Sequence, residues 1–441
     1  MTGPAASLRP LRHRSFALLF FAGLVSNTGT WMESVAVGAL LIARTGQATW
    51  AVLVAAAAFL PIGLLSPVGG ALADRLPRRP VMIAGYTVAA AVSAVLAGLV
   101  AAGHEDPALL VALVTVEGSA MALTGPFQQA VLPDLVPPAD FLAAIALNSA
   151  QWNLGRIAGP AAAGVAIAAF GYPVAFAANA VSFLAVVAAL LFVRFAPPAG
   201  RAGERLLASL RAGLRAGRGE PGSWAAIVTI GVVALIGSPF IALVPAMAQR
   251  MAGGPAAGGA RAIAAATGTL TTAQGIGAVV GALSLAGLAA RFGRGRVLGA
   301  SLVLFPPALI LYGTARGLWW AAGGLFLVGL VYLGVLSGLS TVVQLRAPAA
   351  YRGRVLSLFS VALGVAYPVG SLIQGPVVDR IGIAWTTVAS AVLLSGVLGA
   401  VAVARPGLRR ALLGPVPDAA PAPVRLEEAS PSCPIRPTVT G

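Results

Sequence analysis

The chain has 441 residues, of which 58% are hydrophobic and only 10% are charged, and its mean hydropathy is +0.90. A soluble domain cannot bury so much apolar surface, and apolar stretches of about 20 residues recur along the whole chain, as they do in transmembrane helices. The alternating pattern of a membrane β-barrel is absent, so the composition predicts an all-α integral membrane protein.

The formal net charge of +16 comes from Arg alone, because the sequence contains no Lys. Most of the Arg residues fall in every second loop and in the two tails. This is the positive-inside distribution, with both termini in the cytoplasm. We therefore interpret the charge as a sign of membrane topology and expect no nucleic-acid partner. Abundant Ala, Gly and Pro suggest a GC-rich bacterial genome and hence a multi-pass protein of the bacterial cytoplasmic membrane.

Twelve membrane-spanning helices are expected in chain order. They cover residues 16–43, 50–72, 81–103, 108–131, 141–169, 173–195, 223–250, 263–289, 297–315, 318–345, 355–378 and 383–404. Residues 1–195 and 223–405 then form two six-helix bundles. A few Pro, Ser and Gly residues recur at a constant offset in the two halves, which indicates a parallel repeat.

The segments outside the bundles have their own patterns. In the linker 196–222, Leu206, Leu210 and Leu214 recur every four residues with Arg on the other face, which predicts an amphipathic helix on the inner membrane surface. The tail 406–441 is rich in Pro and Ala, and we expect it to be disordered in the cytoplasm. The only Cys, Cys433, lies in this tail, so no disulfide framework is expected.

Three ionisable residues fall inside the predicted spans: Glu33, Glu117 and Arg156. A charge near the bilayer centre is costly unless it is paired or hydrated, so each is a candidate functional residue. At about 1.5 Å per residue, the glutamates lie roughly 15 Å and the arginine about 20 Å below the outer helix ends. We expect the arginine to reach a glutamate and the three to couple proton movement to helix rearrangement. Alternatively, Glu33 is solvated and Arg156 is a permanent structural clasp.

Polar residues also recur at helical spacing in otherwise apolar spans, which predicts helix faces that line a cavity. The alternative is that they form hydrogen bonds between helices. The candidate cavity-lining residues are Asn27, Thr30, Met121, Thr124, Gln128, Asn148, Trp152, Gln274, Gln344, Tyr367 and Gln374.

The short segment between the second and third spans reads Gly69-Gly70-Ala71-Leu72-Ala73-Asp74-Arg75-Leu76-Pro77-Arg78-Arg79. It resembles the loop 2–3 signature of the major facilitator superfamily, G-x-x-x-D-R-x-x-R-R. The resemblance implies that Asp74 meets the N-terminus of the eleventh helix, where the helix dipole favours a carboxylate, and holds the cytoplasmic side shut in the outward-open state. The simpler interpretation is a solvated charged turn. The candidate switch residues are Gly69, Gly70, Asp74, Arg75, Arg78 and Arg79.

The fifth predicted span contains a second motif, formed by Gly155, Gly159, Pro160 and Gly164. It resembles the antiporter motif of drug-exporting facilitators, G-x-x-x-G-P-x-x-G-G, with Ala163 in place of one Gly. Small residues permit close helix contact, and Pro can bend a helix. Ordinary packing of small residues is the alternative explanation.

Together with segments such as Gly29-Thr30-Trp31-Met32, these motifs make the chain similar to the enterobactin-exporter and macrolide-efflux branch of the superfamily. The resemblance implies the major facilitator fold and proton-coupled efflux of a hydrophobic or amphiphilic small molecule, such as a drug, siderophore or metabolite. A lysophospholipid transporter is the alternative, followed by a receptor or scaffold without transport. We expect no enzyme activity, cofactor or metal, and a monomer whose partners are the bilayer, the substrate and protons.

Overall fold

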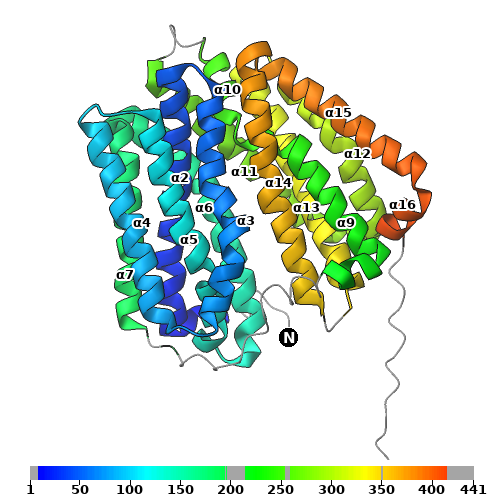
Figure 1. Cartoon of the computed structure of the whole chain (residues 1–441), viewed down its shortest axis with the longest axis horizontal. Helices are drawn as coiled ribbons and strands as arrows, with labels where there is room; N and C mark the ends of the chain where they lie inside the picture. Colours follow the sequence, from blue (N-terminus) through cyan, green and yellow to red (C-terminus); the bar gives the residue numbers. More distant parts are fainter. Residues whose placement is uncertain (1–7, 194, 196–213, 254–258, 349–350, 415–441) are drawn as a thin grey trace, which may run out of the picture.

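The computed structural model describes residues 8–193, 195, 214–253, 259–348 and 351–414 (Figure 1). Every regular element among them is a helix. In the first half these are η1 (Arg9–Arg12), α2 (Arg14–Thr45), α3 (Ala48–Ala73), α4 (Arg78–Ala101), α5 (Pro107–Leu135), η2 (Pro138–Asp140), α6 (Phe141–Phe170) and α7 (Tyr172–Phe192). In the second half they are α9 (Pro221–Val232), η3 (Val233–Gly237), η4 (Ser238–Ile241), α10 (Val244–Met251), α11 (Gly259–Phe292), α12 (Arg294–Gly313), α13 (Leu318–Arg346), α14 (Arg352–Ile381), α15 (Ile383–Ala404) and α16 (Pro406–Leu413).

Eleven helical segments among the described residues are long and apolar enough to cross a membrane, when Pro221–Met251 is taken as one segment. The remaining long helix is α2, which has 32 residues and lacks a sufficiently apolar stretch. Its middle carries Asn27, Thr30 and Glu33, whose polar side chains lower the hydropathy. With α2 the segments match the twelve helices predicted from the sequence. The all-α fold is therefore confirmed.

One predicted helix, 223–250, is not continuous. It is interrupted by the π-helical turn η3 and the 3-10 turn η4 before the chain continues as α10. Pro239 and Pro245 lie in the first turns of η4 and α10. Proline lacks the backbone N–H that would continue the ladder of hydrogen bonds, so each of these two positions favours an interruption of the α-helix.

The segments outside the bundles also differ from expectation. We expected disorder from residue 406 onward, but residues 406–413 form α16, whose Leu412 is buried against the second half. Residues 415–441 lie outside the described part of the chain. So do Leu206 and Leu210 of the predicted amphipathic linker helix, whereas Leu214 begins a short helical stretch that runs to residue 219.

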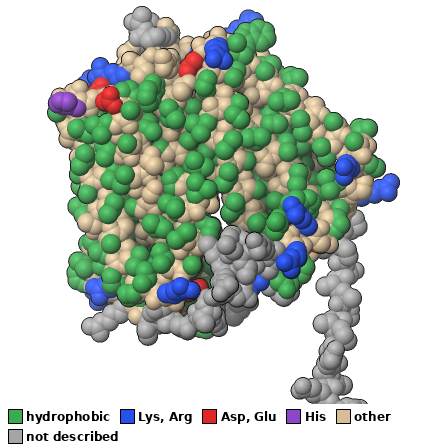
Figure 2. All heavy atoms as spheres, viewed as in Figure 1, with side chains coloured by type: hydrophobic (Ala, Val, Ile, Leu, Met, Phe, Trp, Pro, Cys, Tyr) green, Lys and Arg blue, Asp and Glu red, His purple; other side chains and the backbone are tan. Residues whose placement is uncertain are grey.

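The two sides of the molecule are named here by the chain ends: α2 begins and α15 ends on the terminal side, at the bottom and at the right edge of Figure 1. The opposite side is the one at which α3 begins and α14 ends. Figure 2 shows that hydrophobic side chains cover most of the visible face, while charged side chains gather near the helix ends. This distribution suits a body surrounded by lipid.

The two halves touch through α3 against α14 and α6 against α11. Along α3, the contacts run from Gly63, where an added Cβ atom would be 3.3 Å from the Gly364 carbonyl carbon of α14, to Thr49 near Gly375 at the opposite side. Between them, the ring of Phe59 meets that of Tyr367 edge-on at 5.6 Å. The ribbons of α3 and α14 are close on that side and separate toward the terminal side (Figure 1). The halves are therefore joined at one side of the molecule.

Candidate functional site

The two predicted membrane glutamates meet inside the first half. Glu33 on α2 and Glu117 on α5 are 4% and 7% exposed, and their carboxyl groups are within hydrogen-bond reach of each other. Asn179 Nδ2 on α7 donates to Glu33 Oε2 at 2.8 Å, and Ser93 Oγ on α4 donates to Glu117 Oε2 at 3.2 Å. Asn179 Nδ2 also reaches Ser93 Oγ at 3.3 Å. We call these four residues the carboxyl cluster; it joins α2, α4, α5 and α7.

Two glycines allow the helices to come this close. Gly29 lies one turn before Glu33, and a Cβ atom added there would be 2.5 Å from Asn179 Oδ1. Gly118 follows Glu117, and a Cβ atom there would be 2.7 Å from the carbonyl oxygen of Ala57 on α3. Small residues at such contacts are the usual means of bringing membrane helices together. The backbone thus positions both carboxyl groups in the interior of the bundle.

The partners of the carboxyl groups are neutral. A hydrogen bond between two carboxyl groups needs a proton on one of them, and two adjacent carboxylates in an apolar site repel each other. Among the described ion pairs, none joins Glu33 or Glu117 to an arginine. The cluster is therefore suited to hold and release a proton, with Ser93 and Asn179 as neutral hydrogen-bond donors.

The expected ion pair between Arg156 and a glutamate is not formed. The Arg156 guanidinium instead lies over the Trp31 ring, 5.7 Å from its centroid, and Trp152 meets Trp31 edge-on at 5.9 Å. The hydroxyl groups of Tyr332 and Tyr367, from the second half, are close enough to interact with Arg156 electrostatically. Depth along a helix predicted the pairing, but α6 turns this side chain toward the contact between the halves. We call these five residues the aromatic–arginine group.

The antiporter-like motif lies where α6 passes between α2 and α11. A Cβ atom on Gly155 would be 2.8 Å from the Cβ of Asn27, and one on Gly159 would be 2.5 Å from the Cβ of Trp31. On the other face of α6, the carbonyl oxygen of Pro160 and the Cα of Gly164 lie against Gly268 of α11. The motif therefore allows α6 to approach one helix of its own half and one of the other half.

The candidate cavity-lining residues occupy different places. Gln128 and Asn148 line a cavity of about 80 Å³ inside the first half, where Gln128 Nε2 donates to the Tyr86 hydroxyl. Met121 packs against the apolar cluster around Phe127. Gln274 is buried, and its Nε2 has no hydrogen-bond partner among the described residues.

The polar groups of four other candidates form hydrogen bonds within the protein. The hydroxyl groups of Thr30 and Thr124 donate to carbonyl oxygens one turn earlier, at 3.0 and 2.7 Å. Gln344 donates to Ser340 on its own helix at 3.1 Å, and Gln374 donates to the carbonyl oxygen of Ile236 in η3 at 2.9 Å. Of these four, only Gln374 forms the bond between helices that was the alternative explanation for the polar stripes, whereas the other three bond within their own helices.

The candidate switch loop lies on the terminal side. Arg78 pairs with Asp134 of α5 at 2.6 Å, and Arg79 donates to the carbonyl oxygen of Leu191 on α7 at 2.5 Å. Asp74 follows the last residue of α3 and is exposed, and its carboxylate forms no hydrogen bond or ion pair with any described residue. The expected contact with the start of α14 is therefore not made in this conformation. A Cβ atom added to Gly69 would be 2.6 Å from the Leu123 carbonyl oxygen of α5, whereas one added to Gly70 would meet open space.

The corresponding contact exists on the opposite side, through a residue that the sequence analysis missed. The Asp379 carboxylate at the end of α14 accepts hydrogen bonds from the backbone N–H groups of Ala48 and Thr49 at 2.5 and 3.2 Å, and from the Thr49 hydroxyl. It caps the N-terminus of α3, where the helix dipole favours an anion. The sequence signal was present: Gly375 to Arg380 repeats the G-x-x-x-D-R spacing of Gly70 to Arg75.

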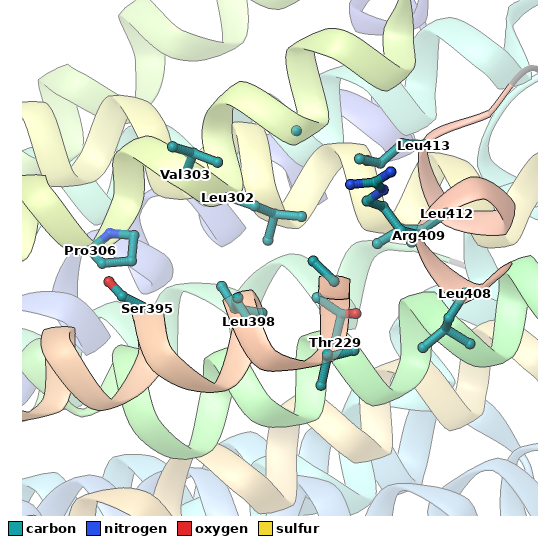
Figure 3. A pocket seen from close by; sticks show the side chains of 14 residues that line it. Thr229, Leu302, Val303, Pro306, Ser395, Leu398, Leu408, Arg409, Leu412 and Leu413 are labelled. Atoms are coloured by element: carbon teal, nitrogen blue, oxygen red, sulfur yellow. The ribbon is translucent and has the colours of Figure 1, made fainter. Parts of the chain in front are cut away.

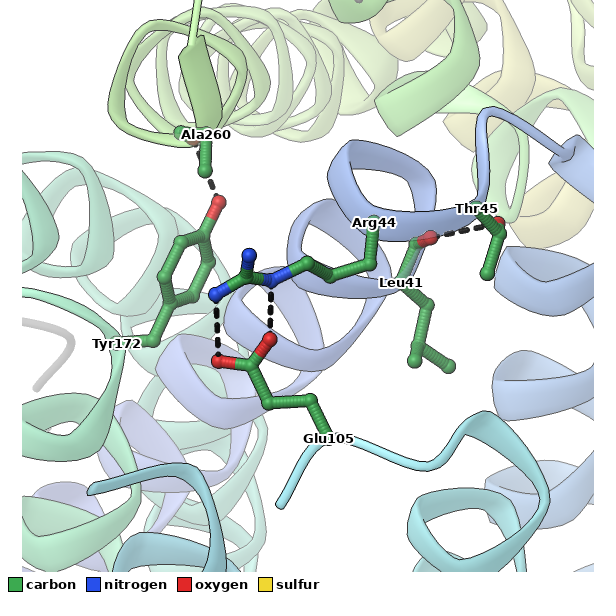
Figure 4. A network of polar contacts seen from close by, with 6 residues as sticks. All are labelled: Leu41, Arg44, Thr45, Glu105, Tyr172 and Ala260. Atoms are coloured by element: carbon green, nitrogen blue, oxygen red, sulfur yellow. Dashed lines mark hydrogen bonds and ion pairs between the residues drawn. The ribbon is translucent and has the colours of Figure 1, made fainter. Parts of the chain in front are cut away.

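Further polar contacts surround this side of the molecule (Figure 4). Arg44 at the end of α2 pairs with Glu105, which precedes α5. The Tyr172 hydroxyl at the start of α7 donates to the carbonyl oxygen of Ala260 on α11 at 2.6 Å. The tyrosine thus links the two halves on the same side of the molecule as the Asp379 cap, whereas the ion pair stays within the first half.

Two helical bundles that touch at one side, with a cluster of buried carboxyl groups in one of them, are the architecture expected of a secondary membrane transporter. The family described as "Transmembrane secretion effector", MFS_3, matches residues 5–415, and the chain belongs to this family. It is therefore a multi-pass transporter of the major facilitator superfamily that moves a small molecule across a membrane, and it is not an enzyme.

Relatives and solved structures agree with this assignment. The chain is 29% identical over 412 residues to the multidrug efflux pump Tap of Mycobacterium tuberculosis, covering 91% of this chain and 96% of that protein. It is 27% identical over 403 residues to Tap of Mycolicibacterium fortuitum, covering 89% and 96%. The crystal structure of the nucleoside transporter NupG matches with a TM-score of 0.66 at 14% identity, covering 89% of this chain and 98% of that one.

Proposed function

We propose that the protein exports a hydrophobic or amphiphilic small molecule from the bacterial cytoplasm in exchange for protons, as a monomer in the cytoplasmic membrane. The full-length similarity to proteins named multidrug efflux pump supports efflux. The buried contact between Glu33 and Glu117 is the observation that carries the proton coupling, because their described partners are neutral.

In this proposal the proton-holding unit is the carboxyl cluster alone, without Arg156. With one proton, the two carboxyl groups share a hydrogen bond and hold α2 and α5 together. Loss of that proton leaves two carboxylates side by side in an apolar interior, and their repulsion favours separation of the helices or access of water. Since Ser93 and Asn179 tie α4 and α7 to the same point, protonation is linked to the packing of four helices.

We further propose that the terminal side faces the cytoplasm, as the Arg distribution predicts, and that the structure is the inward-facing state. The Asp379 cap holds the outer side closed in this state, while Asp74 is unengaged. In the outward-facing state the roles reverse, and Asp74 caps the N-terminus of α14. Each carboxylate stabilises one state through the same charge–dipole interaction, so the transporter alternates between two similar contacts.

The substrate is proposed to bind at the aromatic–arginine group, because this group lies where the halves meet. Trp31, Trp152 and Arg156 come from the first half, and Tyr332 and Tyr367 from the second. Trp31 Nε1 is buried with no hydrogen-bond partner among the described residues, so it is available to a ligand. Aromatic faces and one guanidinium group favour a flat, aromatic molecule that is neutral or anionic.

The test uses inside-out vesicles with an acidified lumen and a pH-sensitive dye inside. Adding neutral, anionic and cationic aromatic compounds in turn shows which of them releases protons from the lumen. Proton release that depends on a neutral or anionic compound and on the protein supports the proposal. Movement of lysophospholipid without proton release, or compound transport unaffected by collapse of the proton gradient, contradicts it.

A further inference from the structure

Two adjoining cavities lie in the half that lacks the carboxyl cluster. An apolar cavity of about 470 Å³ lies between α9, α12, α15 and α16 (Figure 3). Its walls are mostly aliphatic, and Thr229, Ser395 and Arg409 are the polar residues that line it. The aliphatic lining includes Leu302, Val303, Pro306, Leu398, Leu408 and Leu412.

The cavity opens toward the surface that faces lipid. Val303 on α12 is 71% exposed and Val401 on α15 is 40% exposed, although both line it. In a membrane these exposed aliphatic side chains meet acyl chains. A ligand can therefore enter from the side, out of the bilayer, without passing through the space between the two halves.

A basic cavity of about 590 Å³ adjoins the apolar one. The two share Arg409 and Leu413, and the second is also lined by Arg346 and Arg410. Arg346 is engaged with Glu220 at 3.7 Å and with the carbonyl oxygen of Gly414 at 3.2 Å. Among the residues that the structure describes, no acidic residue lines either cavity. Arg409 and Arg410 are exposed on α16 and supply positive charge beside the apolar space.

Small residues in the sequence allow α16 to pack closely against α9 and α12. A Cβ atom on Gly295 of α12 would overlap the carbonyl oxygen of Leu413, and one on Gly222 of α9 would be 2.9 Å from that of Ala411. The two glycines therefore give α16 room to lie against α9 and α12. Leu408 and Leu412, one turn apart, face the apolar cavity while Arg409 stands at its edge (Figure 3).

We propose that these two cavities together bind an anionic phospholipid from the surrounding bilayer. One acyl chain fills the apolar cavity, and the headgroup phosphate lies between Arg409 and Arg410. The combination of an aliphatic space that opens sideways and a basic mouth without acids matches the two ends of such a lipid. The lipid stabilises α16 against the second half. This site is separate from the substrate site proposed above.

The experiment is native mass spectrometry of the purified full chain, titrated with phosphatidylglycerol, phosphatidylcholine or glycerol phosphate. One variant combines Arg409→Gln with Arg410→Gln. A second, Gly399→Phe, fills the apolar cavity that Gly399 lines, and Gly396→Phe on the same helix is its matched control because Gly396 does not line the cavity. Added Cβ atoms at both glycines meet open space, so neither change forces the backbone.

We expect the wild type to retain one phosphatidylglycerol in preference to phosphatidylcholine, and not to retain glycerol phosphate. The double Arg variant should lose about 25-fold in affinity for phosphatidylglycerol, since each basic residue near an anionic lipid contributes about fivefold. Gly399→Phe should lose the bound lipid while Gly396→Phe keeps it. Equal retention of both lipids, equal binding by the two Phe variants, or binding of free glycerol phosphate would overturn the proposal.

Discussion

Substitution of Asp379 should directly change the equilibrium between the inward-facing and outward-facing states. Asp379→Ala removes three hydrogen bonds to the start of α3, two of them from backbone N–H groups. Loss of a helix N-cap costs about 1 kcal/mol, and loss of an exposed charge at a helix N-terminus about 0.5 kcal/mol. The inward-facing state should therefore lose about 1.5 kcal/mol, which is roughly tenfold in the equilibrium between the two states. Asp379→Asn keeps a capping side chain and should shift it only about twofold.

The assay is alkylation of a single reporter cysteine in a Cys433→Ser background. Val52→Cys is a suitable reporter, because Val52 is fully buried on α3 against Gly375 of α14 and becomes reactive when the outer side opens. Its labelling rate should rise about tenfold with Asp379→Ala and about twofold with Asp379→Asn. Glu105→Gln is the control, since that acid pairs within the first half. An unchanged labelling rate in both Asp379 variants would refute the claim that the Asp379 cap holds the outer side closed.

Three further variants, one of them with a matched control, test the switch loop, the antiporter-like motif and the proposed substrate site. Asp74→Asn should shift the balance toward the inward-facing state by about 0.5 kcal/mol, as Asp379→Asn does in the other direction, seen as about twofold slower alkylation of Val52→Cys and slower transport; unchanged alkylation would contradict the switch. Gly159→Leu should overpack the contact with Trp31 at a cost of about 1–3 kcal/mol and abolish export, whereas Ala163→Gly should not; normal export by the Leu variant would exclude a contact role. Arg156→Ala should weaken substrate binding but leave proton release intact when the compound is saturating. Loss of proton release in this variant would instead support the ion pair between Arg156 and a glutamate that the sequence predicted.

The features that were predictable from sequence are those encoded along the chain. The length and hydropathy of the apolar stretches predict the helices. Glu33 and Glu117 are conspicuous because a charged side chain within the bilayer is energetically costly. The loop motif around Asp74 points to the correct superfamily because its spacing is specific. None of these inferences depends on how a helix is rotated about its own axis.

The inferences that failed needed that rotation or a contact between distant segments. Arg156 and the glutamates lie at similar depths, but the small residues of α6 turn Arg156 toward Trp31 and the second half. Asp379 was not among the candidate residues, although its spacing repeats that of Asp74. Its role became visible only when α14 was placed beside α3. The helix α16 was overlooked in a tail whose Pro content suggested disorder.

The central claim is that the pair Glu33 and Glu117 carries the exchanged proton. The measurement is compound-dependent proton release from inside-out vesicles for Glu117→Gln and Glu33→Gln, with compound binding and gradient-independent exchange measured in parallel. We predict that Glu117→Gln binds compound and partly retains exchange but loses proton release, and that Glu33→Gln has a weaker effect. Full proton release in both single variants and in the double variant would contradict the claim.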